Sequence, residues 1–381
     1  MDGRPHRRLP DGPAGAPWDF PLPAFDLTAY DFPRAPDRAR LEPVRPSEDA
    51  GPPSRRLPAD QWLLGVYTVD PDTPLYDLGA DSLTLLELLE AVKRRHGTDI
   101  DLASLGHHVT LSGILGKLDN DTRQPARSGT EAEVEVWQHG TGKDILCLVH
   151  PVGGDIQAYR PLVSALPAEL TVCLIPDPAL RDPRLPARSI TDRAADYLRA
   201  VRAAFPAAGS RLRLAGWSFG AWIALSMAAL AERDGQPAAS LYLLDPPPPG
   251  ARTEYAAYDE IQVNEAFARE LGGSRTGGLT SPGRAYAERL ARCCRANLAA
   301  MAEHRLPRIT TTPTTVWLAE RPADTTVLAP RPTPPGAWNT HLPHPRVHKV
   351  DTDHYGLVAA SHARDIADQL TAETRPSTRQ P

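Results

Sequence analysis

Three residue types that support nucleophilic catalysis occur in the second half of the chain, beginning with a serine between two glycines. Ser218 is the centre of Gly216-Trp-Ser-Phe-Gly220, between a predicted strand at Leu212–Ala215 and a helix that starts near Phe219. A sharp strand-to-helix turn projects its central side chain, and small residues two before and two after it prevent clashes. A serine hydroxyl needs a base, and the base needs an acid that holds its tautomer. The pattern predicts an acid and then a histidine further along the chain.

The expected partners follow later strands. Asp245 comes directly after the predicted strand Leu241–Leu244, which places its carboxylate at the same sheet edge as the serine, and His354 lies just past the last strand. Glu320 and Asp324 follow another strand and are alternative acids. We favour Asp245 as the acid and His354 as the base.

A tetrahedral intermediate also needs two backbone N–H donors for its oxyanion. One comes from the residue after the nucleophile, here Phe219, and the other from an early strand-to-helix loop. The loop His150-Pro-Val-Gly-Gly154 follows the strand Ile145–Val149. We expect the Val152 N–H to be the second donor, and the glycines let the loop approach a substrate.

The predicted strands and helices that would position these residues alternate along the chain. Short β-branched runs alternate with amphipathic stretches, a pattern typical of a mostly parallel sheet with helices on both faces. The strands are predicted at 145–149, 170–175, 212–215, 241–244, 315–318 and 346–350, and the helices near 159–166, 192–204, 219–233, 260–271 and 286–304, before a C-terminal helix.

A second serine occupies the first turn of a predicted leucine-rich helix in the first third of the chain. Ser82 lies in Asp77-Leu-Gly-Ala-Asp-Ser-Leu83, and Leu85, Leu86, Leu88, Leu89 and Val92 continue an apolar stripe to about His96. The unpaired N–H groups of a helix start favour a phosphate on the hydroxyl. The same residues could serve only as a helix cap.

The string Leu78-Gly-Ala-Asp-Ser-Leu83 followed by a helix resembles the attachment motif of acyl and peptidyl carrier proteins. The resemblance implies that Ser82 carries a covalent 4'-phosphopantetheine, added by a phosphopantetheinyl transferase. It also implies that the segment is a small all-α bundle.

The later segment resembles the type I thioesterase domains of nonribosomal peptide and polyketide synthases. The resemblance rests on Leu214-Ala-Gly-Trp-Ser-Phe-Gly-Ala221, on the string Leu-Tyr-Leu-Leu that ends at Asp245, and on Asp353-His354. It implies an α/β-hydrolase fold with a helical lid at about 246–308, and Ser218, Asp245 and His354 match the catalytic triad of the family.

Composition shifts mark the expected domain boundaries. Residues 1–58 are rich in proline, which prevents helix and sheet ladders, and are predicted to be a disordered leader. The carrier is expected at 59–121, a linker at 122–131, the thioesterase domain at 132–372 and a disordered tail at 373–381.

Charge and cysteine content exclude several classes of function. A net charge of −5 gives no basic excess for nucleic acid, and the four cysteines suit neither a disulfide framework nor a metal site. No apolar stretch reaches membrane-spanning length. The expectation is a cytoplasmic protein without metal.

Taken together, the two resemblances imply a carrier–thioesterase didomain of antibiotic or other secondary-metabolite biosynthesis. Upstream synthase or synthetase enzymes would load the carrier, and the thioesterase would release the acyl or peptidyl chain by hydrolysis or cyclisation. Alternatives are an editing or acyl-transfer thioesterase that acts in trans, a carrier scaffold with an inert hydrolase half, and an ordinary esterase with a chance helical prefix.

Overall fold

The structure is a computed structural model of the 381-residue chain. It describes residues 70–78, 80, 82–98, 100, 105, 109–119, 132–206, 211–249, 281–322 and 336–372. The predicted leader, linker and tail, and the helix expected at 260–271, lie outside the described residues.

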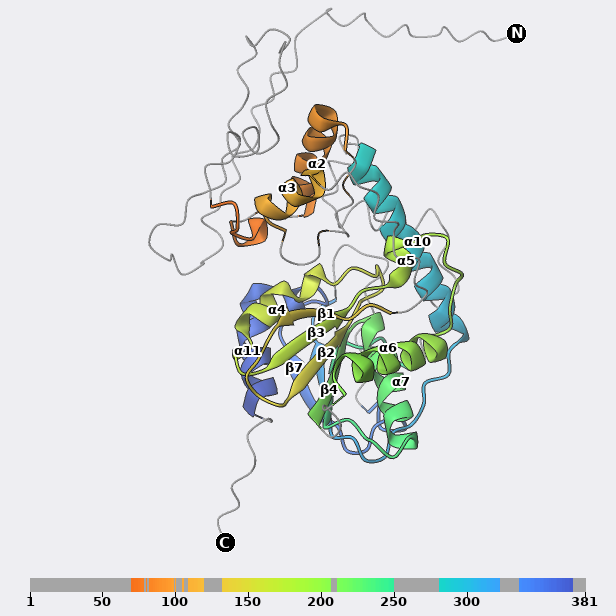
Figure 1. Cartoon of the computed structure of the whole chain (residues 1–381). Coiled ribbons are helices and arrows are strands. Elements are labelled where there is room, and N and C mark those ends of the chain that lie inside the picture. The colour runs from red at the N-terminus through yellow and green to blue at the C-terminus, as the bar shows by residue number, and fades with distance from the viewer. Residues whose placement is uncertain are drawn as a thin grey trace, which may run out of the picture. The chain divides into compact units, whose positions relative to one another are not determined.

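A seven-stranded sheet, in the order β1-β3-β2-β4-β5-β6-β7, forms the centre of the hydrolase part (Figure 1). Only β1 is antiparallel to its neighbour; the other pairs are parallel. The strands are β1 (Glu135–Gln138), β2 (Ile145–Val149), β3 (Thr171–Ile175), β4 (Leu212–Trp217), β5 (Ser240–Leu244), β6 (Thr314–Ala319) and β7 (Arg346–Val350). The predicted α/β-hydrolase class is confirmed.

Helices cover both faces of this sheet (Figure 1). In the interior strand β2, Leu146 and Leu148 pack into a core with α4 and α11, whereas Cys147 and Val149 pack into a core with α6 and α7. Successive side chains of a strand point to opposite faces, so a strand buried on both sides is apolar throughout. The helices are η4 (Gln157–Tyr159), α4 (Arg160–Ala165), α5 (Pro178–Arg181), α6 (Ile190–Ala204), α7 (Phe219–Arg233), α10 (Ser281–Glu303), η7 (Gly356–Val358) and α11 (Ala360–Ala372).

The carrier segment is helical in its described part. It contains η2 (Leu75–Leu78), α2 (Ser82–His96) and α3 (Leu111–Asp119). The leucines predicted to form the apolar stripe of α2 are buried where their side chains are described, from Leu85 to Leu89, together with Val92. They share a core with Leu111 and Ile114 of α3, which confirms the predicted helical character of this segment.

Strand β1 was not predicted from the sequence. It is four residues long, and Trp137 is its one buried residue. Its register to β3 shifts between Val136 and Gln138. A short, half-exposed edge strand with a bulge lacks the β-branched run that marks the buried strands.

No helix in the described ranges is both long and apolar enough to span a bilayer.

A carboxylate at the end of α7 fixes the segment that enters β6. The two oxygens of Glu232 accept hydrogen bonds from the backbone N–H groups of Thr310, Thr311 and Thr312 at 2.7, 2.9 and 2.7 Å. Desolvation opposes ionisation of Glu232, but these hydrogen bonds outweigh it and lower the pKa to about 2. The helix that follows Ser218 is thereby connected to β6, the strand that comes after α10 (Ser281–Glu303) along the chain.

We expect Glu232→Gln to lower the melting temperature by a few degrees at neutral pH, because a neutral amide oxygen accepts these bonds more weakly than a carboxylate. A depressed native pKa stabilises the fold above the unfolded value of 4.5 and loses that effect as the pH falls toward 2. The difference in melting temperature between wild type and variant should therefore shrink below about pH 4.5. Thermal melts from pH 7 to pH 3 measure it, and a constant difference would contradict the assignment.

Candidate active site

Ser218 occupies a strained turn between β4 and α7. Its backbone has φ 55° and ψ −128°, outside the regions that L residues normally adopt. A Cβ at Gly216 would lie 2.2 Å from the Gly220 backbone, and one at Gly220 would lie 2.4 Å from the carbonyl oxygen of Val149. The strand-to-helix turn predicted from the two glycines is therefore present, and both glycines are required by close backbone approach.

Hydrogen bonds to neighbouring strands fix this turn. The Ser218 N–H donates to the Leu244 carbonyl of β5 at 2.9 Å. The Trp217 N–H donates to the Tyr159 hydroxyl at 2.7 Å, and that hydroxyl donates to the Val149 carbonyl at 2.6 Å. Burial raises the pKa of Tyr159, so the phenol stays protonated and able to donate. The turn is anchored to β5 on one side and β2 on the other.

Asp245 and His354 meet at the same sheet edge. His354 Nδ1 lies 2.7 Å from Asp245 Oδ2, and both residues are about 5% exposed or less. The other carboxylate oxygen accepts a hydrogen bond from the Ala319 N–H at 3.0 Å. Because a carboxylate can only accept, Nδ1 carries the proton, which leaves Nε2 of a neutral imidazole free to act as a base.

The imidazole also stacks on the residue before the serine. The rings of Trp217 and His354 have centroids 4.8 Å apart, and the indole N–H donates to the His354 carbonyl at 3.2 Å. Within the part of the chain that the structure describes, the Ser218 hydroxyl makes no hydrogen bond. Catalytic hydrogen bonds are often long in a free enzyme and tighten with substrate.

Of the two alternative acids, the one that the structure describes, Glu320, is paired with a lysine and not with His354. Glu320 is exposed and pairs with Lys349, with Oε1 3.4 Å from Nζ. Asp324 lies outside the described residues. Asp245 is thus the carboxylate that the structure places on His354.

Both expected oxyanion donors lie at the carboxyl ends of neighbouring strands. Phe219 is the first residue of α7, and Val152 lies in the loop after β2. Helix N-termini and loops after parallel strands present free N–H groups. Gly154 in this loop has φ 87°, and a Cβ there would lie 2.8 Å from the Asp177 side chain.

Behind this loop is a buried polar network that sequence reasoning missed. His150 Nε2 lies 2.9 Å from the Tyr197 hydroxyl of α6, and Arg193 of the same helix donates to Asp177 at 2.6 Å. Asn297 of α10 reaches the same carboxylate at 3.2 Å. The available signal was a histidine directly after a fully buried strand, where a polar side chain needs a partner.

The environment of this network sets the charges of its members. Burial lowers the pKa of His150; of its two charged neighbours, Asp177 opposes this effect and Arg193 adds to it. Burial alone would raise the pKa of Asp177, but the charge of Arg193 and the hydrogen bonds from Arg193 and the Ala179 N–H lower it below its usual value. The ring is therefore neutral beside a charged Asp177–Arg193 ion pair.

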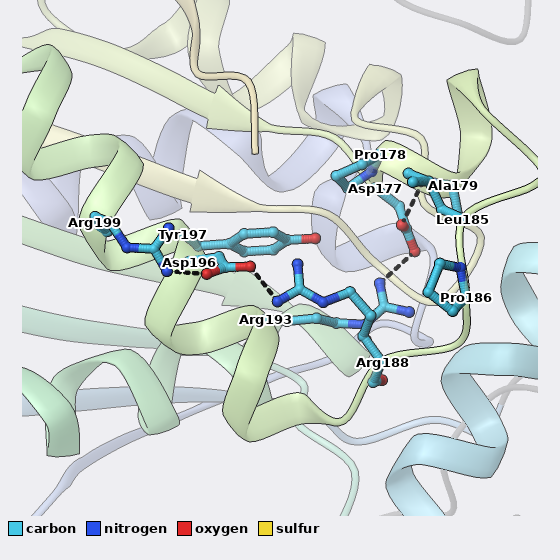
Figure 2. A pocket seen from close by; sticks show the side chains of 10 residues that line it. All are labelled: Asp177, Pro178, Ala179, Leu185, Pro186, Arg188, Arg193, Asp196, Tyr197 and Arg199. Atoms are coloured by element: carbon cyan, nitrogen blue, oxygen red, sulfur yellow. Dashed lines mark hydrogen bonds and ion pairs between the residues drawn. The ribbon is translucent and has the colours of Figure 1, made fainter. Parts of the chain in front are cut away.

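Helix α6, which carries Arg193 and Tyr197, borders a cavity of about 310 Å³ (Figure 2). Figure 2 shows Asp177, Arg193 and Tyr197 in its wall, next to Asp196, which pairs with Arg188 and Arg199. Among the described residues, its lining does not include the Ser218 turn or the Asp245–His354 pair.

Ser82 is the first residue of α2, as predicted. The helix is 15 residues long, and its last turn carries the basic residues Lys93 to His96. Its N-terminal end presents unpaired N–H groups and partial positive charge, which fit a phosphate on the serine hydroxyl.

Family models match two parts of the chain. The thioesterase domain matches residues 144–374, and the phosphopantetheine attachment site matches residues 63–118. The first match covers more than half of the chain, so the protein belongs to the thioesterase family. It carries a phosphopantetheine attachment domain as well, which confirms both resemblances predicted from the sequence.

The chain is similar to parts of much longer curated proteins. A dimodular nonribosomal peptide synthase of Bacillus subtilis (strain 168) is 23% identical over 238 residues, which are 60% of this chain and 10% of that protein. The nonribosomal peptide synthetase agiA of Aspergillus flavus is 30% identical over 182 residues, which are 47% of this chain and 2% of that protein. The chain therefore spans a tenth or less of the length of these two relatives.

A solved multidomain structure shares the fold. Holo-AB3403, a four-domain nonribosomal peptide synthetase, matches with a TM-score of 0.56 at 19% identity, covering 93% of this chain and 28% of that one. The NocB thioesterase domain from the nocardicin cluster has a TM-score of 0.48 at 21% identity, covering 65% of this chain and 99% of that one.

Proposed function

We propose that this protein releases an acyl or peptidyl chain from a phosphopantetheine thioester, in nonribosomal peptide or polyketide biosynthesis, through Ser218, His354 and Asp245. The observation that carries the proposal is the buried hydrogen bond of 2.7 Å between Asp245 and His354. The His354 ring also stacks on Trp217, the residue that precedes the strained Ser218. The carrier match on the same chain supports a carrier-bound substrate.

Ser82 is the residue that would hold the prosthetic group. It lies inside the matched attachment region and begins α2, and the free N–H groups of a helix start favour a phosphate there. A phosphopantetheinyl transferase would modify it, and upstream synthase or synthetase enzymes would load it. The phosphopantetheine arm supplies the thiol that carries the acyl group.

In the first half-reaction, the Ser218 oxygen attacks the thioester carbonyl while His354 Nε2 takes the hydroxyl proton. Asp245 stabilises the imidazolium that forms. The Phe219 and Val152 N–H groups hold the oxyanion of the tetrahedral adduct. Collapse of the adduct breaks the C–S bond, and His354 returns the proton to the departing sulfur, leaving an ester on Ser218.

In the second half-reaction, His354 takes a proton from the releasing nucleophile, which attacks the ester through the same oxyanion site. The proton then passes from His354 to Ser218 as the C–O bond breaks. Water yields a free acid, and an amine or hydroxyl of the chain itself yields a ring. The lid at about 246–308 would decide which nucleophile reaches the ester.

One prediction of the proposed function concerns release from the protein's own carrier. We expect a phosphopantetheinyl transferase with an acyl-coenzyme A to load the wild-type chain and the Ser218→Ala variant equally. Wild type should then lose the acyl mass, whereas Ser218→Ala should keep it, because no other hydroxyl occupies the turn. Intact-protein mass spectrometry over time measures both.

Two control variants accompany this experiment. Ser82→Ala should accept no adduct, and Ser164→Ala, an exposed serine on α4, should behave like wild type. Equal acyl loss from wild type and Ser218→Ala would show that the hydrolase half is inert toward its own carrier. Loading of Ser82→Ala would overturn the attachment site.

A second prediction separates the candidate acids. The Asp245 carboxylate accepts from both His354 and the Ala319 N–H. An amide in Asp245→Asn cannot accept both, so it favours the tautomer whose Nε2 is protonated and unable to act as a base. We expect the turnover number to fall by about 10³- to 10⁴-fold. Steady-state hydrolysis of an acyl-pantetheine thioester measures it.

Glu320→Gln is the matched control for that substitution. Glu320 belongs to an exposed ion pair with Lys349, and such pairs contribute little. Turnover within about twofold of wild type is expected. A loss in Glu320→Gln as large as that in Asp245→Asn would refute the assignment of the acid.

A further inference from the structure

The peptide group between Pro151 and Val152 carries both the Val152 N–H and a carbonyl that hydrogen bonds hold in place. That carbonyl belongs to Pro151, and it accepts hydrogen bonds from His150 Nδ1 at 2.8 Å and from the Gly154 N–H at 3.0 Å. In a trans peptide the N–H points opposite to the C=O. Fixing the Pro151 oxygen therefore fixes the direction of the Val152 N–H.

The next peptide group, between Val152 and Gly153, is held by a residue of α10. The amide nitrogen of Asn297, on α10, donates to the Val152 carbonyl at 2.9 Å and to Asp177 at 3.2 Å. The Asp177 N–H in turn donates to the Gly154 carbonyl at 2.9 Å. Both peptide groups that flank the Val152 Cα are thus restrained by buried side chains.

The tautomer of His150 follows from its partners. The Pro151 carbonyl can only accept, so Nδ1 carries the proton, and Nε2 of the neutral ring accepts from the Tyr197 hydroxyl at 2.9 Å. Burial raises the pKa of Tyr197, which keeps its hydroxyl a donor. Arg193 also interacts with that hydroxyl, and Asp177 holds Arg193 at 2.6 Å.

From this arrangement we propose that His150 and Asn297 are positioning residues that aim the Val152 N–H into the oxyanion site, with His150 acting through the Pro151 carbonyl and Asn297 through the Val152 carbonyl. The proposal rests on the proposed function, because it needs an oxyanion to form at Ser218. Neither side chain touches the reacting atoms. Their effect is confined to the transition state, in which the negative charge develops.

The substitutions at His150 separate hydrogen bonding from packing. His150→Asn places an amide N–H₂ close to the position of Nδ1, so it can still donate to the Pro151 carbonyl. His150→Gln carries the same amide one carbon further, near Nε2, where it reaches Tyr197 and not Pro151. His150→Phe keeps a ring and removes both polar atoms.

The probe is a fluorophosphonate, which requires no knowledge of the acyl chain. Ser218 attacks phosphorus, the P–F bond breaks, fluoride leaves and His354 takes the proton; the phosphonyl oxygen gains negative charge as the oxyanion does. The full chain is labelled at several probe concentrations, and mass spectrometry gives the maximal rate and the half-saturating concentration. Circular dichroism melts report on folding.

We expect His150→Gln and His150→Phe to lower the maximal labelling rate by about 10- to 100-fold, with half-saturation and the pH profile unchanged, because a misaimed donor loses part of the effect of one oxyanion hydrogen bond. His150→Asn should recover most of the rate. Asn297→Leu, which removes the other restraint, should lower it by about tenfold.

Several outcomes would overturn the proposal. They are an unchanged rate in folded His150→Phe, an Asn variant as slow as the Gln variant, or rate losses that only follow the melting temperature. If the His150 variants do not fold, Asn297→Leu decides with the same readouts. Labelling of Ser218→Ala at the wild-type rate would instead refute the proposed function, which keeps the two failures distinct.

Discussion

The close approach of three backbone segments at the Ser218 turn is the constraint on which the site depends. A Cβ on Gly216 would lie 2.2 Å from the Gly220 backbone, and one on Gly220 would meet the end of β2 at 2.4 Å. The chain can pass from β4 into α7 only without side chains there. That passage forces Ser218 to φ 55° and places it at the carboxyl edge of the sheet.

Two buried hydrogen-bonded systems lie on opposite sides of this turn and hold different parts of the site. Asp245 holds His354 on the β5 and β6 side, and Asp177 with Arg193 holds the loop after β2 on the α6 side. Burying a carboxylate is costly unless its partners are in place, so each system has one low-energy arrangement. The polar groups that would meet a developing charge are therefore positioned before substrate arrives.

Local sequence patterns predicted much of the fold and of the candidate site, whereas contacts between residues far apart in the sequence could not be predicted from them. The turn was predictable because glycine spacing and the strand-to-helix change are local, and both resemblances are confirmed by the family matches. The choice of Asp245 over Glu320 needed sheet geometry, because both follow buried strands. The residues that hold the loop after β2 lie far along the chain, with no local signal that links them: Tyr197 comes 47 residues after its partner His150, and Asn297 comes 145 residues after its partner Val152. The catalytic roles stay predictions.

An experimental structure of the phosphonylated full chain tests the central claim most directly. It should show phosphorus bonded to the Ser218 oxygen and the phosphonyl oxygen about 3 Å from the backbone nitrogens of Val152 and Phe219. His354 should still be bonded to Asp245 and should turn Nε2 toward the adduct. Phosphorus on another residue, or a phosphonyl oxygen that faces away from both nitrogens, would contradict it.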